Sequence, residues 1–296
     1  MTGNVADQPL IEQKSSLTRR NFLRGSAITA AGLALYSSEI ARHEISIVTH
    51  NTAIRNLPDA FHDFRVVQIS DIHFEGFTEP FFLRRVIADI NSLQPDLVLL
   101  TGDYISFTPM SRDFVLGAMH RCADLLRSIA CPQRFAVMGN HDSFLGAPTI
   151  GQVLAAVDIP LLVNQYVPIE RAGKRLWVCG VDDPVTHVPD LDSAIPERPD
   201  GPVLLMCHGP DYADEVIVHR RGQLVDVMLS GHTHGGQVRI PFLPPYHLPA
   251  GGRKYVEGFF QLNQMQLYVN RGIGSVGVPF RLNCPPEITL FTLQRA

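Results

Sequence analysis

The sequence predicts a layered α/β fold, and the two halves of the chain support this prediction in different ways. In the first half, short β-branched runs alternate with segments whose apolar residues recur at helical spacing. In the second half, strand-like runs dominate, and one helix is expected to start at Asp211. The chain has 296 residues, which is enough to bury a substantial core.

The boundaries of the expected elements follow from residue types. The run 64–70 is β-branched and bounded by polar residues, whereas apolar residues recur at helical spacing after Pro80, a residue favoured in a first helical turn. The expected strands are 44–48, 64–70, 96–100, 135–138, 161–163, 176–181, 203–206, 225–229, 237–240, 267–269 and 288–293. The other expected helices are 81–90, 112–129 and 149–157, and the long loops are 182–202 and 241–249.

Residues 1–42 are interpreted as a signal segment and flexible N-terminus, and residues 43–296 as a single domain. Arg19-Arg20 precede an apolar, small-residue run from Ala27 to Tyr36, which is the layout of an export signal. The paired arginines resemble the twin-arginine signal, an address that the export machinery reads. We therefore expect a periplasmic or other extracytoplasmic location, with membrane tethering if the segment is not cleaved. The alternative is an ordinary amphipathic N-terminal helix.

Charge and cysteine content narrow the classes of function. The formal net charge is −4, so the basic excess that is typical of nucleic-acid-binding proteins is absent and no nucleic-acid partner is expected. The five cysteines are scattered and form no tight metal-binding pair. They are interpreted as buried thiols, with one disulfide left open as an alternative.

Five short motifs rich in Asp, His and Asn each follow a predicted strand. They are Asp71-Ile72-His73, Gly102-Asp103, Gly139-Asn140-His141-Asp142, His208-Gly209-Pro210 and Gly231-His232-Thr233-His234. Loops beyond the carboxyl ends of strands line the functional crevice of layered α/β folds, so five such loops can converge on one place. Each motif alone could be a simple turn or a structural histidine. The complete set favours a site for zinc, manganese or iron.

The spacing within the motifs indicates how two side chains can reach one ion. Alternate residues of an extended strand end face the same side, so Asp71 and His73 can point into one site, as can His232 and His234. Asp103 is the carboxylate that could bridge two cations. Two metals roughly 3.5–4 Å apart can clamp the attacking and leaving oxygens of a phosphoryl displacement.

The five motifs together resemble the calcineurin-like metallophosphoesterase family over about residues 64–293. The stretches 231–237 and 279–288 are similar to a branch of exported or membrane-associated bacterial phosphodiesterases. The resemblance implies a four-layer α/β/β/α sandwich of two mixed β-sheets flanked by helices. It also implies two divalent metal ions, which could be manganese, zinc or iron.

The resemblance assigns a role to each matching residue. The first metal would have the ligands Asp71, His73 and His234, the second would have Asn140, His208 and His232, and Asp103 would bridge them. His141 would lie beside the substrate as proton donor or transition-state stabiliser, and Asp142 would orient it.

The implied activity is hydrolysis of a phosphoester, with a diester preferred. A metal-bridging hydroxide would attack phosphorus in line, while His141 and the metals would neutralise charge on the phosphoryl oxygens. The substrate would be a small-molecule or lipid-linked phosphoester. The alternatives are a phosphomonoesterase, a lipid-linked pyrophosphate hydrolase of the cell envelope, and a non-catalytic, metal-stabilised binding module.

Three further features of the sequence have no assigned part in this activity. The run 272–277 matches the dinucleotide-binding pattern, but Pro279 and strand-like sequence follow it instead of a helix, so we interpret it as a close-packed loop near the floor of the site. The apolar residues of loop 241–249 are expected to cover the core. If that loop were exposed, it would indicate a membrane-proximal substrate. Arg281 is interpreted as a solvated cation, with phosphate contact as the alternative.

Overall fold

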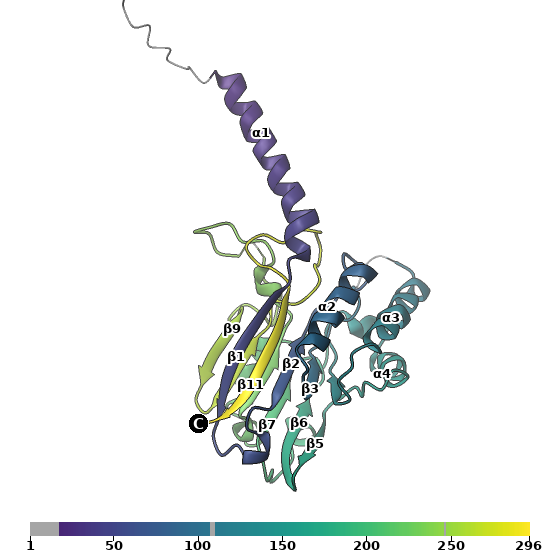
Figure 1. The fold of residues 1–296 in the computed structure, drawn as a ribbon, viewed down its shortest axis with the longest axis vertical. Helices are drawn as coiled ribbons and strands as arrows, with labels where there is room; N and C mark the ends of the chain where they lie inside the picture. The colour runs from purple at the N-terminus through teal and green to yellow at the C-terminus, as the bar shows by residue number, and fades with distance from the viewer. Residues whose placement is uncertain (1–17, 107–109, 246) are drawn as a thin grey trace, which may run out of the picture.

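The structure is a computed structural model that describes residues 18–106, 110–245 and 247–296. Within this part of the chain, two mixed β-sheets lie face to face and helices cover their outer faces (Figure 1). The α/β/β/α sandwich that the family resemblance implies is therefore confirmed. The first 17 residues of the expected signal segment lie outside the described residues.

The first sheet has five strands in the order β1-β11-β2-β3-β4. They are β1 (Ser46–Ile54), β2 (Arg65–Ile69), β3 (Leu97–Leu100), β4 (Arg134–Ala136) and β11 (Glu287–Arg295). Strands β2, β3 and β4 run parallel, so their carboxyl ends meet at one edge, whereas β11 runs antiparallel to β2.

The second sheet has six strands in the order β5-β6-β7-β8-β10-β9. They are β5 (Gln165–Arg171), β6 (Lys174–Gly180), β7 (Val203–Met206), β8 (Val227–Ser230), β9 (Gly258–Leu262) and β10 (Met265–Val269). The four central strands run parallel, and the two edge strands, β5 and β9, run antiparallel to their neighbours.

Alternating side chains of the central strands fill separate cores. Val98 and Leu100 of β3 face the outer helices, while Leu97 and Leu99 face the second sheet. Strand periodicity explains this pattern, because successive side chains point to opposite faces. Both faces of the sheet are buried, which is why the strand is a continuous apolar run.

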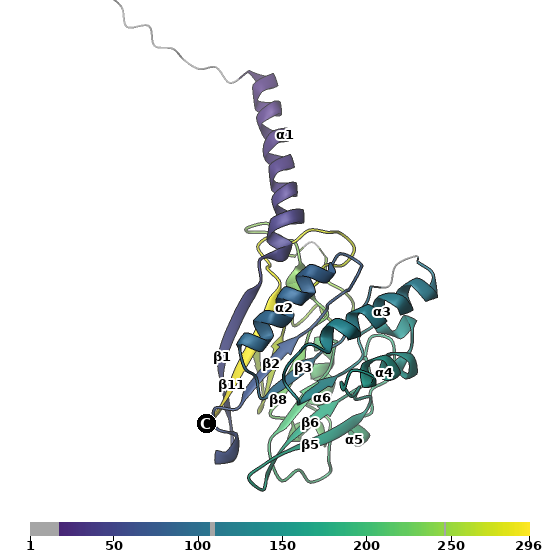
Figure 2. The same cartoon turned by 45° about the vertical axis from the view of Figure 1, so that its right-hand side comes forward.

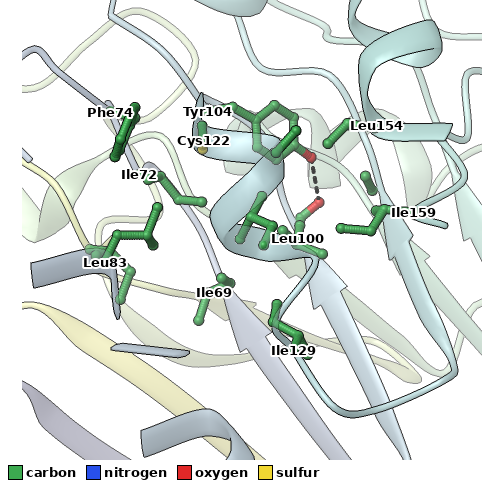
Figure 3. Close-up of a cluster of buried hydrophobic side chains, with 14 of the residues drawn as sticks. Ile69, Ile72, Phe74, Leu83, Leu100, Tyr104, Cys122, Ile129, Leu154 and Ile159 are labelled. Carbon is green, nitrogen blue, oxygen red and sulfur yellow. Dashed lines mark hydrogen bonds between the residues drawn. The ribbon is translucent and has the colours of Figure 1, made fainter. Parts of the chain in front are cut away.

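Three amphipathic helices cover the first sheet (Figure 2). They are α2 (Pro80–Ser92), α3 (Arg112–Leu126) and α4 (Ala147–Ala155). Figure 3 shows their buried side chains: Leu83, Cys122 and Leu154 pack toward Ile69 and Leu100 of the sheet. The outer face of the second sheet is covered by two single-turn helices, α5 (Leu191–Ala194) and α6 (Ala213–Val216).

Several sequence-based expectations about these elements are wrong. The expected strand 237–240 is a loop with one isolated bridge, between Val238 and Leu282, because Gln237 has a positive φ of 53°. The expected strand 161–163 contributes only the bridge from Leu161 to Ala136. The helix expected from Asp211 is limited to a 3-10 turn followed by α6.

Strands β5 and β9 were not expected from the sequence. Both lie at a sheet edge: β5 is mostly exposed apart from Val167 and Ile169, and β9 alternates exposed with partly buried residues, so neither carries a continuous apolar run. The expected loop 182–202 also contains the short helix α5.

Helix α1 (Arg19–Leu35) projects from one end of the sandwich, and none of its residues is buried (Figure 1). The chain enters the domain directly after it, where Ser37 and Ala41 are buried. The backbone N–H of Arg281 donates a 3.1 Å hydrogen bond to the carbonyl of Ser37. None of the helices in the described residues is long and apolar enough to cross a membrane.

All five cysteines are buried and free. The disulfide that was left open as an alternative is therefore wrong, and the interpretation as buried thiols is confirmed. Burial raises the pKa of the Cys207 thiol well above its ordinary value, which keeps it protonated and unreactive.

We predict that a thiol-specific reagent modifies essentially none of the cysteines in the native protein and all five after unfolding without reductant. The measurement is titration with Ellman's reagent in buffer and in guanidinium chloride. Three titratable thiols after unfolding would mean that one pair is oxidised, and would contradict the described packing.

Candidate metal centre

The five predicted motifs meet where the carboxyl ends of parallel strands from both sheets converge. Buried polar contacts join the sheets at this point. Gln68 donates to Thr101 Oγ1 at 3.0 Å and to the carbonyl of Ser230 at 2.9 Å. The Nδ1 atom of His208 lies 2.7 Å from the carbonyl of Thr101. The junction therefore fixes the relative position of motifs that are far apart in the sequence.

One group of side chains consists of Asp71, His73 and His234. The two histidine Nε2 atoms lie 3.0 Å apart, and His234 Nε2 lies 3.4 Å from Asp71 Oδ1. All three residues are buried. Two imidazoles and a carboxylate whose donor atoms converge in this way are a ligand set for zinc, manganese or iron.

A second group consists of Asp103, His208 and His232. Asp103 also lies close to the first group. Its Oδ2 atom is 3.2 Å from Nε2 of His208, in the second group, and 3.6 Å from Nε2 of His73, in the first. One carboxylate therefore lies between two sets of histidines, which is the position that a bridging ligand needs.

The buried Oδ1 atom of Asn140 has no hydrogen-bonding partner among the described residues, and the buried Nε2 atom of His208 faces only the Asp103 carboxylate, 3.2 Å away. An unsatisfied buried polar atom costs about 1–3 kcal/mol, so native proteins rarely keep one without a reason. Both atoms have lone pairs that a cation can accept. The residues present therefore fit a divalent metal on an observation that is independent of the motifs.

The neighbours of each imidazole determine which ring nitrogen is available. A carbonyl only accepts, so the Nδ1 atom of His208 carries the hydrogen that faces Thr101, which leaves Nε2 as the lone-pair atom. In His232, Nε2 lies 2.8 Å from the carbonyl of Ala250, so Nδ1 is the atom left for a metal. Such partners orient metal-binding histidines.

The pKa shifts of the first group favour neutral imidazoles. Burial lowers the pKa of His73 well below its usual value, and burial together with the charge of Arg281 does the same for His234. Neutral imidazole is the form that binds a metal.

The pKa values of the second group reflect the Asp103 carboxylate. Burial would raise the pKa of Asp103, but His208 and His73 outweigh burial and hold it well below its usual value. Burial would lower the pKa of His208, yet the charge of Asp103 raises it well above the usual value. A proton and a cation therefore compete for His208 Nε2.

The backbone at five of these residues lies in the left-handed region. The φ angles are 51° at Asp71, 47° at His73, 57° at Asp103, 72° at His232 and 50° at His234. The expectation that each Asp-x-His or His-x-His pair continues an extended strand is therefore wrong, although both members of each pair do reach the junction. Non-glycine residues in this region cluster at functional sites, and each costs on the order of 1–3 kcal/mol.

Asp142 holds the loops of the junction together. Its buried carboxylate accepts hydrogen bonds from the backbone N–H groups of Asp103 at 2.8 Å, Tyr104 at 2.9 Å and Gly139 at 2.9 Å. The hydroxyl of Tyr104 reaches the carbonyl of Leu100 at 3.2 Å (Figure 3). Burial and the neighbouring Asp103 raise the pKa of Asp142 well above its usual value.

His141 is partly exposed, unlike the histidines of the two groups. Its backbone N–H donates to Asp103 Oδ1 at 2.9 Å, and its ring packs edge-on against His73 with the ring centroids 4.8 Å apart. A cavity of about 360 Å³ opens above these residues. Its lining includes polar residues of the junction and an apolar part formed by Val238, Val276 and Val278; the polar ones are Asp103, Asn140, His141, His232 and His234.

Sequence reasoning did not identify the part that Arg281 plays. Its side chain is fully buried, so the interpretation as a solvated cation is wrong. The guanidinium donates to the carbonyls of Arg271 at 2.9 Å and Gly272 at 3.1 Å, and one of its nitrogens lies 3.3 Å from His234 Nδ1. The guanidinium thus contacts the ring of His234, a candidate metal ligand, at its Nδ1 atom. Arg281 lies in the stretch 279–288, which resembles a branch of the family. The burial of a charged side chain, however, cannot be predicted from a local sequence pattern.

The loop 272–277 is close-packed, as its interpretation required. Gly272 has a φ of 72°, and a Cβ atom there would lie 2.6 Å from the Cβ of Asp71. The backbone N–H of Gly274 donates to the carbonyl of Asp71 at 2.7 Å. This loop forms the floor beneath Asp71.

Comparison with known proteins agrees with this geometry. The sequence matches the calcineurin-like phosphoesterase family over residues 64–236, which is more than half of the chain. The chain belongs to the calcineurin-like phosphoesterase family. It is thus a metallophosphoesterase, a hydrolase that acts on phosphoric ester bonds, and the side chains gathered at the junction are candidate ligands for its metal.

Two relatives align with this metallophosphoesterase over almost their whole length. The metallophosphoesterase YkuE of Bacillus subtilis (strain 168) is 32% identical over 289 residues, covering 94% of this chain and 98% of YkuE. The phosphodiesterase YaeI of Escherichia coli (strain K12) is 31% identical over 294 residues, covering 94% of this chain and 99% of YaeI. The solved calcineurin-like phosphoesterase YfkN of Bacillus subtilis is 12% identical with a TM-score of 0.48, covering 71% of this chain and 81% of that one.

We predict that Gly272→Ala weakens metal binding by about 10- to 100-fold, because its methyl group would push Asp71 out of place. Gly173→Ala is the matched control: Gly173 has a φ of 70° but nothing within 4 Å of its Cβ position. Both variants carry the left-handed cost of about 1–2 kcal/mol, but only one disturbs Asp71. The measurement is calorimetric titration with manganese. Equal affinities in the two variants would contradict a role for this contact.

Proposed function

We propose that this metallophosphoesterase hydrolyses phosphodiesters with two divalent metal ions, which could be manganese, zinc or iron. The observation that carries the proposal is the place of Asp103, whose Oδ2 atom lies 3.2 Å from His208 Nε2 and 3.6 Å from His73 Nε2. A single metal would leave one of these two histidine groups without a partner. The name of the relative YaeI, a phosphodiesterase, supports the diester preference.

The proposed ligands divide between the two ions. Asp71, His73 and His234 would hold the first, Asn140, His208 and His232 would hold the second, and Asp103 would serve both. Asn140 enters this set because its buried Oδ1 atom has no other partner among the described residues. When bound, the two ions lower the pKa of a water nucleophile and neutralise charge on the phosphoryl oxygens.

His141 supplies the chemistry that comes from the chain itself. Its ring lines the cavity, and the hydrogen bond from its backbone N–H to Asp103 Oδ1 fixes it beside the ligand groups. From this position, a protonated ring donates a hydrogen bond to a phosphoryl oxygen and passes its proton to the leaving oxygen. Asp142 keeps the loop of His141 in register with the end of β3.

The walls of the cavity favour a diester over a monoester. A monoester carries a second negative charge near neutral pH, and Arg and Lys are the side chains suited to binding such a charge. The described residues that line this cavity include neither, and Val238, Val276 and Val278 supply an apolar wall instead. Such a wall accommodates the second organic substituent of a diester.

We further propose that the enzyme works outside the cytoplasm. Arg19 and Arg20 begin the exposed helix α1, where an export receptor could read them. Changing both arginines to lysine keeps the charge but removes the paired guanidinium groups, so we predict that the protein accumulates in the cytoplasmic fraction. Immunoblots of cell fractions test this. Unchanged export of the double variant would contradict the twin-arginine assignment.

We predict that metal-stripped protein regains hydrolysis of bis(p-nitrophenyl) phosphate when a divalent metal is restored, with lower turnover of p-nitrophenyl phosphate. His141→Ala should keep its metal while kcat falls by about 10²- to 10⁴-fold, because it removes only the proton donor. Asp103→Asn should lose both metal and activity, because it removes a charge that faces both histidine groups.

The exposed surface residue His120 gives the matched control, and His120→Ala should change neither metal content nor rate. Metal content is read by elemental analysis alongside the assay. Loss of metal from His141→Ala would show that His141 is a ligand or a structural residue. Turnover without any metal would contradict the proposed chemistry.

A further inference from the structure

An exposed cluster of apolar side chains lies next to the metal cavity. The loop after the last histidine motif presents Ile240 with 53% of its surface exposed, Phe242 with 105% and Leu243 with 60%, and Val278 of a second loop is 45% exposed. We call these four residues the apolar rim. The expectation that the apolar residues of loop 241–249 cover the core is therefore wrong for Phe242 and Leu243, while Tyr246 lies outside the described residues. Clustered apolar exposure of this kind marks an interaction surface.

The rim meets the wall of the metal cavity at Val278. Gln237 joins its two loops, because its side-chain amide donates to the carbonyls of Val276 and Val278 at 3.1 Å each. Val238 and Val278 then line the cavity that also contains His141. Val278 is thus the rim residue that reaches the metal cavity, whereas Ile240 and Leu243 line a neighbouring hollow together with Arg239, Lys254 and Glu257.

Helix α1 leaves the domain at the same end of the molecule. Figures 1 and 2 both show α1 rising from the end where the loops around residues 240 and 278 lie. Apolar side chains project from the helix without being buried, among them Phe22, Ile28 and Leu35. Its sequence contains Arg19, Arg20 and Arg24 and no acidic residue.

We propose that this end of the molecule docks on an anionic phospholipid bilayer, with α1 and the apolar rim both in contact with lipid. A helix that exposes apolar side chains on several sides is stable only when apolar groups surround it. The acyl chains of a fluid bilayer can do this. Its arginines, which all lie in the first two turns of α1, match anionic lipid headgroups. The run from Ile240 to Pro245 contains no charge that would oppose insertion of the tip.

Docking in this way would turn the metal cavity toward the lipid headgroups. The consequence, which rests on the proposed function, is that the substrate is a phosphoester carried by a membrane lipid. The apolar wall of Val238, Val276 and Val278 would then contact the part of the substrate nearest the acyl chains.

The test places an environment-sensitive fluorophore on the rim of the full-length protein. All five native cysteines are buried, so a cysteine introduced by Phe242→Cys is the reactive thiol for labelling with a nitrobenzoxadiazole probe. Val218→Cys is the matched control, because Val218 is 74% exposed but lies outside the rim and α1. Vesicles of phosphatidylglycerol and phosphatidylethanolamine are added, and vesicles of phosphatidylcholine give the uncharged comparison.

Emission from position 242 should rise severalfold and shift to the blue with the anionic vesicles, and less with phosphatidylcholine, while position 218 should stay unchanged. No change at 242 in protein that sediments with the vesicles would mean that α1 binds alone, and would overturn the proposal. A blue shift at 242 that depends on protein concentration without vesicles would assign the rim to a second copy of this chain, and would also overturn it.

The same labelled proteins are assayed with bis(p-nitrophenyl) phosphate. This soluble diester reports the proposed chemistry without any membrane, so docking and hydrolysis can fail separately.

Discussion

The structure depends on the burial of two carboxylates at the junction of its sheets. Asp71 is fully buried and Asp103 is 2% exposed, and among the described residues their ion-pair partners are histidines, with no lysine or arginine in contact. A buried charge is costly unless it is paired or coordinates a metal. Burial favours neutral His73 and His234, so these rings supply little compensating charge, and the raised pKa of His208 lets that ring offset the charge of Asp103 but not that of Asp71 as well. A bound metal would balance the remaining negative charge, and the surrounding loops hold the candidate donor atoms in place for it.

The rest of the fold can be understood as the support for this arrangement. Five residues of the junction have left-handed backbone angles, which a flexible loop would relax. Here the loops are fixed by the buried strands that precede them, by the carboxylate of Asp142 and by the guanidinium of Arg281. The two cores on either side of the first sheet supply the stability that such strain requires.

The sequence predicts this centre well because each motif follows a buried strand, and buried strands are continuous apolar runs. The edge strands β5 and β9 escaped prediction because their exposed faces break that pattern. The left-handed angles at Asp71 and His73, and the burial of Arg281, depend on contacts with residues far along the chain. Exposure of Phe242 was missed because apolar content indicates burial only on average. The assignment of individual ligands stays a prediction.

The central claim is that Asp103 stands between two metal ions. Anomalous diffraction from crystals grown with manganese or zinc tests it most directly. The account predicts two peaks, both within about 2.0–2.3 Å of an Asp103 oxygen. One peak should lie among Asp71, His73 and His234, and the other among Asn140, His208 and His232. A single peak in fully loaded crystals, or a second peak away from Asn140 and His208, would contradict the two-metal centre.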